Sequence, residues 1–261
     1  MLSATCHARV SDDRPDLAPL EAIAREVAAE WGIELGEQFS LARYSFVAAA
    51  GDDTVLKVTP PEDDEADEEP EALALWGGDG AVRLVQRDAR RRALLVERAR
   101  PGDDIAELPE AEATAIAVAT GLKLWRPAAE PFRWIGDHVS RWLDNAEGHP
   151  LVALARELYS TLDVGRGTLV HGDFHHHNIL HSARGPLAID PKPMLGEPEY
   201  DVPSFLWNPL PYRMRLDVTE RRLATFAAAG LDEERMRAWA VIRGAYLGAD
   251  DEESAVLRAL V

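Results

Sequence analysis

The sequence has one cysteine, few basic residues and no long apolar run. Cys6 cannot form a disulfide within the chain, which fits a reducing, cytoplasmic compartment. The 28 lysines and arginines face 46 aspartates and glutamates, and the resulting formal charge of −18 argues against binding to nucleic acids or anionic membranes. No stretch is long and apolar enough to span a bilayer, and the first residues lack the basic and apolar regions of a signal peptide.

The composition favours a packed globular protein. Hydrophobic residues make up 46% of the 261 positions, enough for one sizeable core or two smaller lobes. The acidic balance would suit a cationic small-molecule partner, although a soluble acidic surface explains it equally well. The composition indicates no oligomeric state.

Residues 168–193, TLVHGDFHHHNILHSARGPLAIDPKP, predict a short strand, a polar loop at 171–178 and then a β-hairpin. Asp173 lies in this loop, Asn178 follows five residues later at its exit, and Asp190 ends the returning strand. Because a hairpin brings its two ends together, we expect Asn178 and Asp190 to lie close in space.

This arrangement is suited to phosphoryl transfer. An aspartate can orient a hydroxyl nucleophile and accept its proton, while an asparagine and a second aspartate hold the Mg²⁺ that bridges nucleotide phosphates. Protein kinases use the same Asp-x-x-x-x-Asn spacing in their catalytic loop, with HRD and DFG where this chain has HGD and IDP. Taken singly, Asp173 and Asn178 would be explained as turn residues.

Five histidines surround this loop and raise the alternative of a zinc site. Consecutive histidines cannot all face one ion, and the sequence has no partner cluster of cysteine or histidine. We therefore expect His171 to be a structural loop residue, and His175, His176 and His177 to line or flank the substrate side.

Three separated stretches, HGDFHHHNIL, LAIDPKP and GEPEYDVPSFLWNP, together resemble the aminoglycoside and hydroxyurea phosphotransferase family, near the streptomycin kinases. The resemblance implies an α+β, protein-kinase-like fold with two lobes. It places a small antiparallel sheet lobe at residues 1–98, a hinge at 99–102 and a helical lobe at 103–261. It implies ATP and Mg²⁺ as cofactors, Asp173 as the catalytic base, and Asn178 and Asp190 as magnesium ligands.

The resemblance also implies nucleotide contacts in the smaller lobe. The predicted strand TVLKV carries Lys57, which would hold the α/β-phosphates, although a lysine in an alternating strand often simply faces solvent. A glutamate should pair with it. The position of Pro70 favours Glu71, the family's spacing from Trp76 favours Glu69, and the choice stays open. The chain has no Gly-x-Gly-x-x-Gly loop here, which leaves Ser45 as the candidate phosphate contact.

Further contacts follow from the hinge and from the end of the hairpin. The stretch LLVERARPGDDI resembles the family's hinge, so backbone groups of Glu97 to Ala99 would meet the adenine edge. Lys192, two residues after Asp190, is a candidate for neutralising phosphate charge, with a surface ion pair as the alternative. Asp201 would anchor the 171–178 loop or cap the following helix.

The implied function is ATP-dependent transfer of the γ-phosphate to a hydroxyl group of an aminoglycoside antibiotic such as streptomycin, which would inactivate the drug. One alternative is a metabolic kinase for another alcohol, an amino-sugar or hydroxyurea, because a fold does not fix its substrate. Another is a nucleotide-binding regulatory protein with little turnover.

Overall fold

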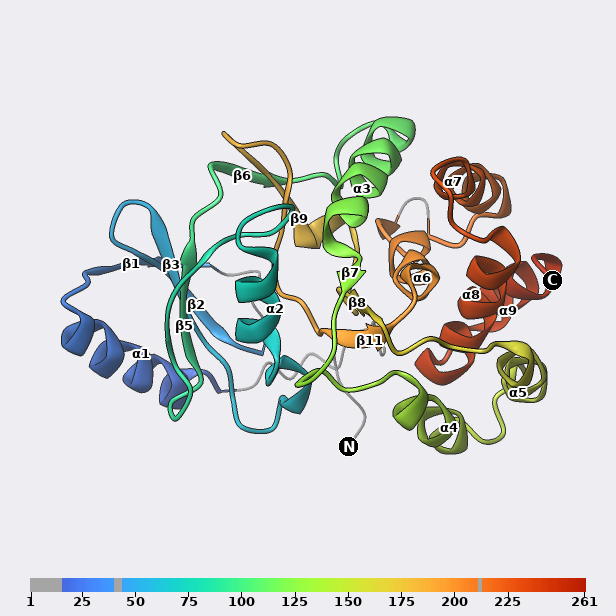
Figure 1. Cartoon of the computed structure of the whole chain (residues 1–261), viewed down its shortest axis with the longest axis horizontal. Coiled ribbons are helices and arrows are strands. Elements are labelled where there is room, and N and C mark those ends of the chain that lie inside the picture. Colours follow the sequence, from blue (N-terminus) through green and yellow to red (C-terminus); the bar gives the residue numbers. More distant parts are fainter. Residues whose placement is uncertain (1–15, 40–43, 211–212) are drawn as a thin grey trace.

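A computed structural model describes residues 16–39, 44–210 and 213–261. A sheet with two helices forms one end of the molecule, and a group of helices forms the other (Figure 1). Cys6 and the residues on which the signal-peptide prediction rests lie outside the described part. Within it, none of the helices is long and apolar enough to cross a membrane.

The first lobe is built on a five-stranded antiparallel sheet in the order β1-β2-β3-β5-β4. Its strands are β1 (Leu35–Gln38), β2 (Phe46–Ala50), β3 (Thr54–Val58), β4 (Leu84–Asp88) and β5 (Ala93–Glu97). Helix α1 (Ala18–Trp31) buries Leu20 and Val27 against this sheet. Residues 40–43, between β1 and β2, lie outside the described part.

Between β3 and β4, the chain forms a short 3₁₀ helix, η1 (Asp64–Ala66), and then α2 (Glu69–Trp76). Figure 1 shows α2 on the side of the sheet that is nearer to the helical lobe. The indole N–H of Trp76, at the end of α2, donates a 2.8 Å hydrogen bond to the carbonyl oxygen of Leu124 in that lobe. The helix is therefore fixed to both parts of the molecule.

The second lobe is mainly helical. Its helices are α3 (Glu110–Leu124), α4 (Gly136–Asn145), α5 (Val152–Thr161), α6 (Val202–Leu206), α7 (Leu216–Ala228), α8 (Glu233–Leu247) and α9 (Asp251–Ala259). Helix α8 buries Trp239 and Ile242 completely, and α5, α6, α7 and α9 pack around it. The helical character predicted for this half of the chain is confirmed.

Two small antiparallel sheets in this lobe carry the loops that matter for function. One has the order β10-β9-β6, and the other has the order β11-β8-β7. Their strands are β6 (Pro101–Asp104), β7 (Arg126–Pro127), β8 (Thr168–Val170), β9 (Ile179–Ser182), β10 (Leu187–Ala188) and β11 (Met194–Gly196). The predicted strand and hairpin are confirmed as β8, β9 and β10, with η2 (His176–Asn178) in the loop. The lobe boundaries at 98 and 103 stay a prediction.

Candidate active site

The loop at 171–178 is held in place by Asp201, which follows η3 (Pro198–Tyr200). The carboxylate of Asp201 accepts the backbone N–H of His171 at 2.8 Å and that of Gly172 at 2.7 Å. The indole of Trp125 donates a third bond at 2.9 Å. Asp201 stands at the start of α6, but its side chain makes no capping bond there. Of the two roles predicted for it, the geometry supports the anchoring of the loop.

The loop also packs tightly against the segment that follows β10. The N–H of Lys192 donates to the carbonyl oxygen of His171 at 2.8 Å, and the ring of His171 contacts the carbonyl oxygen of Ile189 at 3.0 Å. Burial lowers the pKa of His171, which keeps the ring neutral. A Cβ atom on Gly172 would lie 1.9 Å from the carbonyl oxygen of Lys192, so this position requires glycine. His171 is thus a structural residue of the loop, as predicted.

Asp173 and Asn178 face each other within the loop. The amide nitrogen of Asn178 donates to the carbonyl oxygen of Asp173 at 2.9 Å and lies 3.4 Å from its carboxylate. Burial raises the pKa of a carboxyl group, but His175, 3.6 Å away, outweighs this effect, and the pKa of Asp173 lies below its usual value. Asp173 therefore carries a negative charge in a buried setting.

Asp190 is brought to the same place by the hairpin. The N–H of Ile189 donates to the carbonyl oxygen of Asn178 at 3.0 Å, which links the two ends of the hairpin. Asp190 itself has a positive φ of 54°, an uncommon backbone conformation that turns the chain at this point. Burial opposes ionisation of its carboxyl group, yet Lys57 and Lys192 hold its pKa well below the usual range.

Lys57 connects the two lobes at this site. Its ammonium group lies 2.6 Å from Glu69 on α2 and also contacts Asp190 at the end of the hairpin. Burial alone would lower the pKa of Lys57, but Asp190 and Glu69 raise it above its usual value. The residue is only 8% exposed, so the interpretation of Lys57 as a solvent-facing strand residue is wrong.

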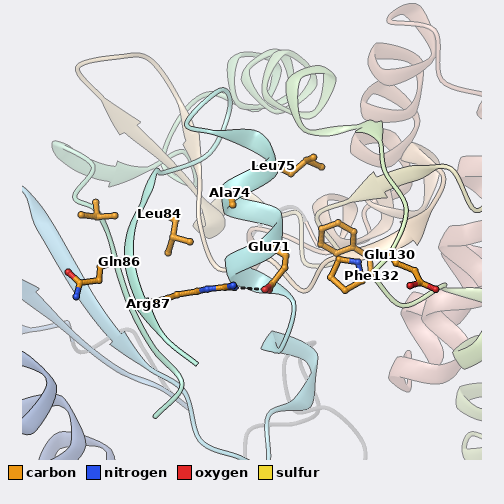
Figure 2. A pocket seen from close by; sticks show the side chains of 10 residues that line it. Glu71, Ala74, Leu75, Leu84, Gln86, Arg87, Glu130 and Phe132 are labelled. Atoms are coloured by element: carbon orange, nitrogen blue, oxygen red, sulfur yellow. Dashed lines mark hydrogen bonds and ion pairs between the residues drawn. The ribbon is translucent and has the colours of Figure 1, made fainter. Parts of the chain in front are cut away.

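The structure distinguishes the two candidate partners of Lys57. Glu69 is buried against the lysine, whereas Glu71 forms an ion pair with Arg87 of β4. Figure 2 shows Arg87 reaching from the sheet to Glu71 across a hollow of about 600 Å³. This hollow is lined by α2, β4 and residues 130–132. Of the two candidates left open by the sequence, Glu69 is therefore the partner of Lys57. Glu71 is not, because it lies on a different face of α2.

The helix begins one residue earlier than Pro70 suggested. Glu69 is the first residue of α2 and Pro70 the second. Proline is tolerated there because the first N–H groups of a helix have no partner within it. Pro70 therefore does not exclude Glu69 from the helix.

The acidic run at residues 62–69 is more than a solvated surface. Asp63 lies 2.7 Å from Lys192, Glu68 lies 3.1 Å from Arg133, and Asp67 pairs with Arg92. With Glu69 on Lys57, these acids reach basic residues from both lobes. The ion pair given as the alternative role of Lys192 is present, but it is not at the surface, since the lysine side chain is only 5% exposed.

The remaining predicted nucleotide contacts lie at or beyond the ends of the inner strands β2 and β5. Ser45 is buried just before β2, and its hydroxyl group lies 3.4 Å from that of Thr59. Glu97 ends β5, and its N–H donates to the carbonyl oxygen of Arg83 at 2.8 Å. An adenine contact from Glu97 would have to use its carbonyl oxygen. Ala99 follows it and is buried. The contacts of Ser45, Glu97 and Ala99 with a nucleotide stay predictions.

The consecutive histidines diverge. His175 lies beside Asp173, and His177 contacts Asp104 of β6 at 2.7 Å. His176 is buried and stacks on Phe205, with ring centroids 3.8 Å apart. Burial lowers the pKa of His176 to about 2. The expectation that His176 lines the substrate side is wrong, because its ring belongs to the core.

Two contributors to the site were missed from the sequence. Trp125 packs against the core, and its N–H also holds Asp201. Asp63 was one acid among many, and only the fold shows that it reaches Lys192. A local sequence pattern carries no signal for either contact, since the partners are distant along the chain.

Comparison with known proteins identifies the family. Residues 34–254 match the family described as aminoglycoside/hydroxyurea antibiotic resistance kinase. The chain belongs to this family. It is therefore a member of a group of kinases, as its motifs indicated.

Three relatives of this protein carry informative names. The chain is 33% identical over 213 residues to a hydroxyurea phosphotransferase of Kitasatospora aureofaciens, a match that covers 76% of this chain and 62% of that protein. It is 28% identical to a streptomycin 6-kinase of Streptomyces glaucescens, covering 85% and 80% of the two chains. It is 30% identical to a streptomycin 3''-kinase of Klebsiella pneumoniae, covering 72% and 75%. The chain thus spans less than two thirds of the first of these relatives.

Solved structures share the fold of this chain at low sequence identity. Choline kinase LicA from Streptococcus pneumoniae matches with a TM-score of 0.62 and 13% identity, over 92% of this chain and 96% of that chain. Aminoglycoside phosphotransferase APH(4)-Ia, in ternary complex with ADP and hygromycin B, matches with a TM-score of 0.59 and 18% identity, over the same shares. These similarities confirm the predicted protein-kinase-like α+β fold.

Proposed function

We propose that this protein transfers the γ-phosphate of ATP to a hydroxyl group of a small antibiotic molecule. One observation carries the proposal. Lys57, held by Glu69 in the sheet lobe, contacts Asp190 in the helical lobe, beside the loop that holds Asp173 and Asn178. The groups that phosphoryl transfer requires are therefore assembled in one place. Complexes of the related fold with ADP and with AMP-PNP support ATP as the nucleotide.

Asp173 is the proposed catalytic base. Its ionised carboxylate would accept a hydrogen bond from the acceptor hydroxyl and take its proton as the oxygen attacks the γ-phosphorus. The new oxygen–phosphorus bond forms while the bond to the β-phosphate oxygen breaks, and ADP leaves. The anchoring of the loop by Asp201 keeps Asp173 oriented, so that catalysis rests mainly on positioning.

Asn178 and Asp190 fit a magnesium site. The amide nitrogen of Asn178 points to Asp173, so its carbonyl oxygen is left for a cation. Asp190 supplies an ionised carboxylate, and Mg²⁺ prefers such oxygen ligands. A bound Mg²⁺ would neutralise charge on the nucleotide phosphates. Lys57 would then orient the triphosphate, with Glu69 holding the lysine in place, and Ser45, Glu97 and Ala99 would complete the nucleotide contacts.

The acceptor we favour is an aminoglycoside such as streptomycin. Two of the named relatives are streptomycin kinases, and the charge of −18 suits a cationic substrate. Hydroxyurea is the second candidate, because another named relative is a hydroxyurea phosphotransferase. The two streptomycin kinases are named for different hydroxyl groups, so either position is a possible target.

The test is ADP release with Mg²⁺-ATP, measured separately with streptomycin, other aminoglycosides and hydroxyurea. Wild-type protein is compared with Asp173→Asn and with the control Asp217→Asn. Asp217 is an exposed residue of α7, with 55% of its side chain accessible. We expect release that depends on the acceptor, remains in the control and falls by at least about a hundredfold in Asp173→Asn.

Nucleotide binding, followed by calorimetry, separates the other outcomes. ATP binding without turnover on any acceptor would contradict the proposed activity and favour a regulatory protein. An equal rate in Asp173→Asn and wild type would contradict the role of Asp173. Mass spectrometry of the phosphorylated product identifies the hydroxyl group that is modified.

A further inference from the structure

Lys192 is a second buried lysine beside the proposed active site. Its ammonium group lies 2.7 Å from the carboxylate of Asp63, and only 5% of its side chain is exposed. Its backbone is fixed to the 171–178 loop through the bond to His171 and the close contact with Gly172. The base of this side chain therefore moves with the loop that carries Asp173.

Asp63, at the other end of this contact, belongs to the sheet lobe. It lies between β3 and η1, six residues before Glu69. The guanidinium group of Arg92 donates to the carbonyl oxygen of Asp63 at 2.5 Å and pairs with Asp67. The segment is thus tied to the turn between β4 and β5, and Asp63 holds its place in this lobe.

Ion pairs that join the two lobes place acidic and basic side chains alternately between them. Asp63 meets Lys192, and Lys57 meets both Asp190 and Glu69. Lys192 also acts electrostatically on Asp190 and on Glu69. One contact holds Asp63, in the segment that leads into α2, and the other holds Glu69, the first residue of α2. The position of Glu69 therefore depends on both.

We propose that Lys192 is a positioning residue, which acts through Asp63 to hold α2 and the Lys57–Glu69 pair over the 171–178 loop. This inference rests on the proposed kinase function and assigns Lys192 a role other than direct neutralisation of phosphate. A lysine that contacts the transferred phosphate must leave Asp63, whereas a positioning lysine must keep it. Removal of one partner from a buried ion pair is also destabilising, because the other charge is then left unpaired in the interior.

The two roles predict different effects of removing Asp63 on ATP binding. A positioning lysine needs Asp63, whereas a lysine that contacts phosphate does not. We would compare wild type with Asp63→Asn, Lys192→Met, the double variant and Lys192→Arg. Glu62→Gln is the matched control, because Glu62 is an exposed acid next to Asp63. The measurements are kcat and KM for ATP with the best acceptor, ATP affinity by calorimetry, and melting temperature.

If Lys192 acts by positioning, Asp63→Asn and Lys192→Met each raise KM for ATP and weaken ATP binding by a similar factor, at least about fivefold. The double variant is then no worse than either single variant, because both remove the same contact. Lys192→Arg restores much of the loss, and Glu62→Gln behaves as wild type. The split between KM and kcat distinguishes this role from a general loss of stability.

Three results would overturn the inference. Unchanged KM and ATP affinity in Asp63→Asn is the first, and a large loss of kcat confined to Lys192→Met is the second, since it indicates direct contact with phosphate. The third is additive losses in the double variant. If Lys192→Met does not fold, Asp63→Asn and Lys192→Arg still decide. Wild type that binds ATP but phosphorylates no acceptor contradicts the proposed function instead, and the calorimetric comparison then tests the ion pair by itself.

Discussion

Asp201 lies 30 residues after His171, and yet its carboxylate accepts the backbone N–H of His171 at 2.8 Å. The same carboxylate accepts Gly172 N–H and the indole N–H of Trp125. We expect Asp201→Ala to leave these buried donors unpaired, at a cost of about 1–3 kcal/mol for each fully buried group. Melting temperature should fall, and kcat should fall further than the loss of folded protein explains.

The control for Asp201 is Trp125→Phe, which removes one of the three donors and keeps an aromatic ring. It should cost less than Asp201→Ala in both measurements. A variant Asp201→Ala with wild-type kcat would show that Asp173 does not depend on this anchor.

Glu69 and Glu71 are both on α2, but only Glu69 meets Lys57. We expect Glu69→Gln to raise KM for ATP about tenfold or more, equivalent to about 1.4 kcal/mol. Glu71→Gln removes a partly exposed pair with Arg87, which is worth about 0–1 kcal/mol. It should leave the KM for ATP unchanged. Equal effects of the two substitutions on this KM would contradict the pairing in the structure.

The ion pair between Lys57 and Asp190 makes stability depend on pH. The pKa of Asp190 is lower in the folded protein than its usual 3.8, so the unfolded chain binds the proton more readily. The stabilisation is therefore present above the usual pKa and is lost as the pH falls through the folded value. We expect the difference in melting temperature between wild type and Asp190→Asn to shrink from neutral pH to about pH 3. A difference that grows toward acid pH would contradict this sign.

His176 is a buried polar residue in the core of the helical lobe. In the part of the chain that the structure describes, neither ring nitrogen has a hydrogen-bond partner, and the ring stacks on Phe205. Burying a polar group without a partner costs about 1–3 kcal/mol. We expect His176→Phe, which keeps the stacking, to raise the free energy of unfolding and to leave KM for the acceptor unchanged. A raised KM for the acceptor would indicate that His176 does line the substrate site.

The loop and hairpin that carry the site were predictable because they are encoded by neighbouring residues. The loop and hairpin follow from turn residues and short apolar runs within residues 168–193. The pairing of β9 with β10 then brings Asn178 and Asp190 together without further information. Lys57 needed the family resemblance, since a lysine within a strand has no distinctive pattern of its own.

The pairing of charges was not predictable in the same way. Whether Lys57 meets Glu69 or Glu71 depends on which face of α2 turns toward β3, and Pro70 allowed both. The acids at 63, 67 and 68 look alike in sequence, and each finds a different base from a distant segment. These ion pairs depend on which distant segments the fold brings together. The local sequence around each acid therefore does not indicate its partner.

The contact between Gly172 and Lys192 also limits which residues can occupy position 172. Protein kinases carry arginine at the corresponding place, in HRD. Here a side chain at Gly172 would overlap the carbonyl oxygen of Lys192, and φ at this residue is +83°. Restoring the arginine would require the neighbouring backbone to move at the same time. Substitution of Gly172 by arginine alone should therefore disrupt this loop, and a change to the protein-kinase motif would need a compensating change in the Lys192 segment.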